Sequence, residues 1–216
     1  MAAVKQPRRA YSSGLRQEQA RRTRLRILES AERLFQRDGY AATTIDRIAA
    51  TAGVATDTVY AVFRSKRSVL SSLLDLRVGG DDQAVPMLER SAPQQMRRER
   101  SQRRQIAKLA AGVSQAVERA RPIDDIMRTA AAVDPEIARL RARVQEERFT
   151  NMVTIAKWLQ ANGPLRGDRS VEEAGAIIWS LTSPEIHRLL RTERGWDLDQ
   201  YRRWLEDTLA RTLLRA

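Results

Sequence analysis

The amino-acid sequence predicts an all-α fold, in which a short N-terminal domain of three helices, a helix-turn-helix, precedes a larger helical domain. Apolar residues recur at spacings of three and four through most of the 216 residues, which is the period of helices buried on one face. Ser, Thr and Asp stand at several expected helix starts, and Gly follows several expected helix ends. No segment shows the strict alternation of a half-buried strand, and no internal repeat is visible.

The N-terminal elements follow from these signals in order. Residues 1–20 are basic and lack periodic apolar positions, which predicts a flexible basic arm. Thr43 and Asp46 have capping-box spacing, Gly53 can adopt a positive φ, and Ser65 is a good N-cap. The expected helices are one from about Thr23 to Asp38, a second over Thr44–Ala52, a third over Thr56–Phe63 and a fourth after Ser65.

The remaining helices are expected at about 95–120, 122–133, 135–162, 171–182, 184–194 and 198–214. Pro122 is interpreted as a helix start, as are Pro135 and Pro184. Ser170 and Asp197 each stand three residues before Glu or Gln, as in a capping box. We therefore expect an arm at 1–20, a helix-turn-helix domain at 21–68 and a helical domain at 69–216.

Composition bounds the function. The chain has no cysteine and a single histidine, so no thiolate chemistry and no multi-histidine metal site is expected within it. No apolar run is long enough to span a bilayer and no secretory signal is present, which favours a cytoplasmic protein without membrane contact. Residues 1–80 contain 15 Lys and Arg against 7 Asp and Glu, whereas the other 136 contain 24 against 20. This concentration of positive charge suits a polyanion partner.

Residues 43–66 carry the most specific pattern. Two short helices are expected to meet near Gly53, with Ala49 small enough for a close crossing and Val54 and Val59 buried beneath the second helix. That helix then leaves a polar face outward, which is what insertion into a DNA major groove about 12 Å wide requires.

The stretch from Thr23 to about Leu76 resembles the N-terminal domain of the tetracycline-repressor (TetR) family of transcriptional regulators. The matching residues are Ala31, Leu34, Phe35, Gly39, Tyr40, Thr43, Thr44, Ile48, Ala49, Ala52, Gly53, Val54, Thr58, Val59, Tyr60, Phe63, Ser65 and Lys66. Two positions depart from the family pattern: Asp57, where Gly or a basic residue is common, and Ala55, where a Ser cap is usual. Asp57 leaves the base preference open.

The resemblance implies binding to a double-stranded DNA operator. Thr43, Thr44, Tyr60 and Lys66 would contact phosphates, and Thr56, Asp57 and Thr58 would face base edges. For three of these residues a role without DNA contact stays open: Thr43 could be only an N-cap, Tyr60 a core aromatic and Lys66 a solvated charge. The basic arm would follow flanking phosphates or a minor groove, or would remain a solvated tail. The Arg-rich run 97–104 is better explained as a solvated surface.

In this family the second domain binds a small ligand and forms a homodimer. Two apolar helical stripes fit such an interface, although each could instead pack within its own chain. The candidate interface residues are Ile177, Ile178, Leu181, Tyr201, Trp204, Leu205, Thr208, Leu209 and Leu213. Candidate contacts for an apolar or weakly polar organic effector are Met127, Phe149, Met152, Trp179 and His187, each of which could equally belong to the core.

The expected function is that of a homodimeric, DNA-binding transcriptional repressor released from its operator by a small organic ligand, with no cofactor and no metal. A ligand-responsive activator and a non-switching architectural DNA-binding protein are the alternatives. An enzyme is disfavoured, because the sequence has no glycine-rich phosphate loop and no histidine beside a plausible nucleophile.

Overall fold

The computed structural model describes residues 8–215, and its helices divide into two units, one ending at Leu73 and one beginning at Leu74. Helices account for nearly all regular structure in the described residues, where a single antiparallel bridge joins Leu165 and Leu214. The all-α prediction is therefore confirmed. None of the helices within residues 8–215 is both long and apolar enough to cross a bilayer.

The N-terminal unit is built on a core shared by its helices. Its elements are α1 (Arg8–Ala42, interrupted at Gly39), α2 (Ile45–Ala52), α3 (Thr56–Phe63) and the first half of α4 (Lys66–Gly79). Phe35 of α1, Ile48 of α2, Val59 of α3 and Leu70 of α4 are all almost fully buried. The interior of this small unit is thus assembled from one apolar face of each helix.

The start of α1 differs from the sequence prediction. Helical structure begins at Arg8, whereas a flexible arm was expected to continue to residue 20 and the helix to begin near Thr23. Glu18 explains part of the difference, because it forms ion pairs with Arg21 at 3.5 Å and Arg22 at 3.0 Å, one turn along the helix. The portion of the predicted arm at residues 1–7 lies outside the described residues.

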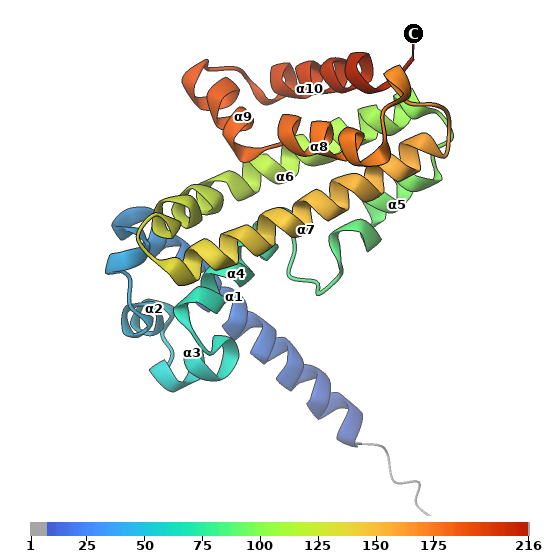
Figure 1. Ribbon diagram of the computed structural model, residues 1–216. Helices are drawn as coiled ribbons and strands as arrows, with labels where there is room; N and C mark the ends of the chain where they lie inside the picture. Colours follow the sequence, from blue (N-terminus) through green and yellow to red (C-terminus); the bar gives the residue numbers. More distant parts are fainter. Residues whose placement is uncertain (1–7, 216) are drawn as a thin grey trace, which may run out of the picture. The chain divides into compact units, whose positions relative to one another are not determined.

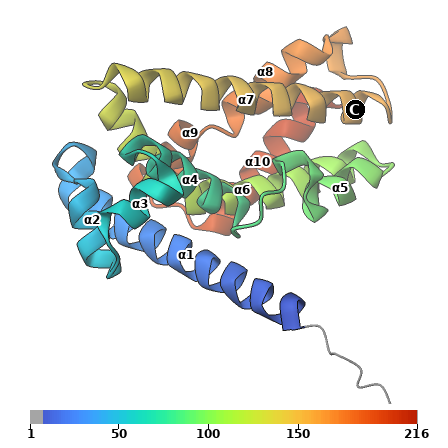
Figure 2. The same ribbon diagram turned by 90° about the horizontal axis from the view of Figure 1, so that it is seen from below.

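The C-terminal unit contains the remaining helices, which are seen in Figure 1. They are α5 (Ser91–Arg98), α6 (Gln102–Ala131), α7 (Pro135–Gln160), α8 (Val171–Leu181), α9 (Pro184–Arg188) with a π-helical turn at Leu189–Glu193, and α10 (Leu198–Leu213). Helix α7 lies along α8, as Figure 2 also shows, and α6 contacts both α7 and α10. The predicted capping boxes of α8 at Ser170 and of α10 at Asp197 are both present.

One predicted break is wrong. Pro122 was expected to start a new helix, but it lies inside α6, which continues from Gln102 to Ala131. Ile106, Leu109, Ile123 and Met127 are buried on both sides of the proline. Burial of this apolar face offsets the one backbone hydrogen bond that proline cannot donate, so packing overrides the local signal.

Candidate functional site

The turn between α2 and α3 has the geometry that the sequence predicts. Thr44 is the N-cap of α2 and its Oγ1 accepts a hydrogen bond from the Arg47 backbone N–H at 3.2 Å. Gly53 ends α2 in the left-handed conformation, with φ 63° and ψ 42°, which a residue with a side chain adopts only at a cost. Val59 is fully buried, so the turn holds α3 by one face and leaves the other outward.

The outward face of α3 presents both polar and apolar groups. Asp57 is exposed and Tyr60 is 49% exposed, so the alternative in which Tyr60 is a core aromatic is not supported. Thr58 is half-buried, and Thr56 is held by its hydroxyl, which donates to Asp46 Oδ1 at 2.8 Å. The structure therefore brings the predicted base-facing residues together on one short helix, with Thr56 fixed by α2.

Thr43 is not available as a phosphate contact. Its side chain is fully buried, and its hydroxyl donates to the Gly39 carbonyl at 2.8 Å. The N-cap of α2 is Thr44, one residue later than capping-box spacing indicates. Thr43 instead satisfies a carbonyl left open where α1 is interrupted at Gly39, so its role is structural.

Lys66 was expected to bind phosphate, and its ammonium group makes contacts inside the protein. Its Nζ donates to the carbonyls of Tyr40 and Thr43, each at 2.8 Å, and lies 4.2 Å from the centroid of the Tyr40 ring. Lys66 at the start of α4 thus joins that helix to the segment between α1 and α2. This structural arrangement had no signal in the sequence, because the residues lie more than twenty positions apart.

Two further basic residues support the same unit. Arg47 of α2 donates to Asp38 Oδ2 at 2.7 Å and to the Ala42 carbonyl at 3.1 Å, which joins α2 to the end of α1. Hydrogen bonds lower the pKa of the Asp38 carboxyl, and the one that Arg37 donates has the largest effect. Arg24 of α1 lies 4.7 Å from the ring centroid of Phe63, in cation–π contact.

Arg64, the residue that ends α3, has a positive φ of 64° with ψ −30°. This conformation is strained for an L-residue and not for glycine, so Arg64→Gly is expected to raise the free energy of unfolding by roughly 0.5–1 kcal/mol. Ala50→Gly, at an exposed position of α2, is the matched control and should lower it by about 1 kcal/mol. Urea denaturation of the two variants measures both, and a loss of stability in Arg64→Gly would contradict the assignment of strain.

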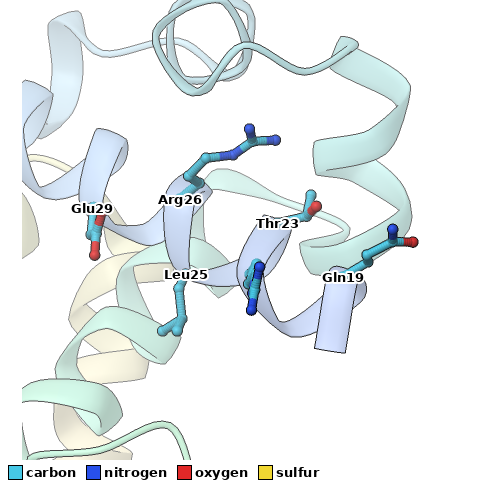
Figure 3. A pocket seen from close by; sticks show the side chains of 6 residues that line it. Gln19, Thr23, Leu25, Arg26 and Glu29 are labelled. Carbon is cyan, nitrogen blue, oxygen red and sulfur yellow. The ribbon is translucent and has the colours of Figure 1, made fainter. Parts of the chain in front are cut away.

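Basic side chains also line α1 before the helix-turn-helix. A shallow, open depression is lined there by residues of α1 alone, among them Arg22, Thr23, Leu25 and Arg26, and Figure 3 shows Leu25 and Arg26 leaving the helix in opposite directions. Since one helix supplies every lining residue, the depression is a helix surface rather than an enclosed ligand cavity. It is part of the surface of α1 that carries the basic side chains of Arg22 and Arg26.

Most of the predicted interface residues lie in the core of the C-terminal unit. Five of the nine, Ile178, Tyr201, Leu205, Leu209 and Leu213, have no exposed surface in the single chain. The other four, Ile177, Leu181, Trp204 and Thr208, are half-buried. The alternative in which the stripes pack within their own chain is therefore correct for the five buried residues, because α10 packs on α6 and α8.

The predicted effector residues are buried beside polar groups that the sequence did not reveal. Met127, Met152 and His187 are buried, and Phe149 and Trp179 are half-buried with ring centroids 6.5 Å apart. His187 Nε2 lies 2.8 Å from Glu118 Oε2, although its N–H bond does not point at that oxygen.

The interior of the C-terminal unit also contains charged groups. Asp124 is 5% exposed, and burial raises the pKa of its carboxyl. Burial lowers the pKa of the Arg148 guanidinium to about 10. The unit predicted to bind an apolar or weakly polar effector thus also holds charged groups in its interior, because residues on separate helices converge. Within residues 8–215, no three His, Asp or Glu side chains cluster as metal ligands would.

Similarity to known sequences is concentrated in the N-terminal unit. The pattern of the family described as "Bacterial regulatory proteins, tetR family" matches residues 27–73. The HTH-type transcriptional regulator TtgR of Pseudomonas putida is 43% identical over 58 residues, which are 27% of this chain and 28% of that protein. The chain thus aligns with little more than a quarter of this curated relative.

Solved structures extend the similarity to the fold of both units. NalD of Pseudomonas aeruginosa, described as the secondary repressor of the MexAB-OprM multidrug efflux pump, has 22% identity and a TM-score of 0.69, with 91% of this chain and 98% of that chain covered. A putative transcriptional regulator from Saccharomonospora viridis, solved with choline, has 21% identity and a TM-score of 0.65, with 89% and 98% covered. The tetR family pattern over residues 27–73 and the helix-turn-helix geometry thus make the N-terminal unit similar to the tetR family of bacterial regulatory proteins, and the solved regulators share the fold of the whole chain.

Proposed function

We propose that the protein is a homodimeric transcriptional repressor of the cytoplasm that binds an operator through α3 and leaves it when a small organic effector binds the C-terminal unit. The observation that carries the proposal is the outward face of α3, where Asp57 and Tyr60 are exposed while Val59 and Phe63 anchor the helix from below. A short helix held in this way fits a major groove.

Phosphate contacts would come from Thr44, Tyr60 and basic side chains of α1, and base contacts from Asp57 and Thr58. Asp57 is the only acid on α3, and an aspartate at a groove accepts a hydrogen bond from the cytosine N4 amine. A second copy could still cover the half-buried part of the predicted interface, which consists of Ile177 and Leu181 of α8 and Trp204 and Thr208 of α10. A protein of the same fold has been solved with choline, which supports a small-molecule effector for the C-terminal unit.

The test is footprinting on the intergenic DNA upstream of the gene, followed by fluorescence anisotropy with the protected duplex at several salt concentrations. Each phosphate neutralised lowers log affinity by about 0.9 per decade of salt, so a dimer with several contacts per protomer should give a slope on the order of −5 or steeper. A flat salt dependence, or equal affinity for random DNA, would overturn the proposal.

Variants of α3 test its placement. Tyr60→Phe is expected to weaken binding to all sequences alike, because phosphates carry no base identity, whereas Asp57→Ala should change the preferred base by about 1–3 kcal/mol of discrimination. Asp199→Ala removes an equal charge from an exposed position in the first turn of α10 and is the control for the general electrostatic effect. A change of base preference in the control, or none in Asp57→Ala, would place another element in the groove.

A further inference from the structure

Polar groups without protein partners gather inside the C-terminal unit. Four neighbouring helices each contribute one: Arg148 of α7, Trp179 of α8, His187 of α9 and Tyr201 of α10. Arg148 Nη2, Trp179 Nε1, His187 Nδ1 and Tyr201 Oη are all buried and make no hydrogen bond to the protein. His187 and Tyr201 are themselves 1% and 0% exposed.

These side chains share one region. The Arg148 guanidinium lies 4.8 Å from the centroid of the Trp179 ring, and the rings of His187 and Tyr201 are 4.9 Å apart and nearly perpendicular. Burial raises the pKa of the Tyr201 hydroxyl, and the positive charge of Arg148 acts on the same hydroxyl in the opposite direction. Buried polar atoms in folded proteins are nearly always paired, so four unpaired ones in one region indicate a partner that is not a protein group.

The charge in this region is unbalanced. Arg148 Nη1 donates to the Trp179 carbonyl at 2.9 Å and to Thr182 Oγ1 at 3.2 Å, which fixes the guanidinium. Its Nη2 is left without a hydrogen-bond acceptor. No carboxylate oxygen within the described residues lies within 4.0 Å of it, whereas the neighbouring Arg141 pairs with Glu185 at 2.8 Å. A pKa of about 10 keeps Arg148 protonated at neutral pH, so a cation without a contacting counterion remains in the interior.

We propose that the effector is an organic anion, a carboxylate on an aromatic or aliphatic body, whose carboxylate pairs with Arg148. The inference rests on the proposed function only in placing the effector site in this unit. Arginine and carboxylate match in shape and charge, and their hydrogen bonds are about twice as strong as neutral ones. The Trp179 indole N–H and the Tyr201 hydroxyl are further donors for the same anion, while Phe149, whose ring centroid lies 6.5 Å from that of Trp179, offers apolar surface to its body.

The two other classes of ligand fit less well. A cationic ligand would be repelled by Arg148, with Asp124 offering little compensation because burial favours its neutral form. A neutral ligand would leave the guanidinium charge without a contacting counterion at a half-buried position, which costs free energy. Only an anion would both accept hydrogen bonds from the unpaired donors and neutralise the positive charge of Arg148.

The experiment compares 2-naphthoate and decanoate with 2-naphthamide and decanamide by isothermal titration calorimetry and by the shift in melting temperature. We expect the carboxylates to bind and to raise the melting temperature of the wild-type protein, and the amides to bind at least about tenfold more weakly, since a charged hydrogen bond outweighs a neutral one. Arg148→Gln should abolish this preference. Arg143→Gln, at an exposed position of the same helix, is the matched control and should retain it.

Tyr201→Phe keeps the ring and Trp179→Phe keeps an aromatic side chain of smaller size, and each removes one donor, so they test the site if Arg148→Gln does not fold. Each should weaken binding of the carboxylates several-fold. Equal binding of acids and amides, no binding of either acid to the wild type, or an equal loss in Arg143→Gln would overturn the inference. Operator affinity without ligand is measured separately, so failure to bind DNA would count against the proposed function and leave the carboxylate result standing.

Discussion

Replacement of Leu205 with arginine is expected to unfold the C-terminal unit rather than to separate two folded protomers. Leu205 has no exposed surface and belongs to a core that also contains Ile106, Met152, Ile178 and Leu209. A guanidinium there would lack both solvent and a counterion, and an unpaired buried charge together with lost packing costs more than about 4 kcal/mol. Circular dichroism should show a much lower melting temperature or a loss of helical signal.

Thr208→Arg is the matched variant, because Thr208 is half-buried and lies one turn further along α10. If the outer faces of α8 and α10 form the proposed dimer interface, this variant should remain folded and elute as a monomer in size-exclusion chromatography with light scattering. A folded, monomeric Leu205→Arg with a wild-type melting temperature would show that Leu205 faces a second copy after all.

The sequence predicts best those features that neighbouring residues determine. The bounds of α3, Thr56–Phe63, agree with the prediction, and the starts of α8 and α10 follow from their capping boxes. The turn at Gly53 is equally local, because only its own φ and ψ require glycine. The elements with the largest errors are α1 and α6, in which ion pairs or packing override local signals: the lack of periodic apolar positions before residue 20 in α1, and Pro122 in α6.

Burial of a face is predictable, but its partner is not. The stripe through Tyr201, Leu205 and Leu209 is apolar at helical spacing, and such spacing requires only that the face leave water. Whether α6 of the same chain or a second copy covers it depends on the tertiary fold. The five interface residues found in the core were therefore misassigned for a reason that no pattern within α10 could reveal.

The buried polar region was missed by the sequence prediction for the same reason. Arg148, Trp179, His187 and Tyr201 are separated by up to several tens of residues, and each is ordinary in its own helix. Arg148 in particular lies in a segment rich in charged residues that reads as a solvated face. Only the packing of α7 against α8 turns it inward, so a half-buried cation and unpaired donors become visible in the structure alone.

Lys66→Met is expected to lower the free energy of unfolding by roughly 2–4 kcal/mol, because hydrogen bonds to a charged group contribute about 1.5–3 kcal/mol and two carbonyls would lose their donor. Methionine keeps the apolar stem of the side chain and removes the ammonium that binds the carbonyls of Tyr40 and Thr43. Lys108→Met, at an exposed position of α6, is the control and should leave stability unchanged. Urea denaturation provides the measurement.

The same variant distinguishes the structural role of Lys66 from the phosphate contact that family resemblance implies. If Lys66 acts only within the protein, Lys66→Met should reduce stability and leave the salt dependence of operator binding unchanged below the unfolding transition. If it binds one phosphate per protomer, the slope of log affinity against log salt should become shallower by about 0.9 for each phosphate no longer neutralised. Reduced stability together with a shallower slope would show that the hydrogen bonds to Tyr40 and Thr43 form in the free protein and give way when DNA binds.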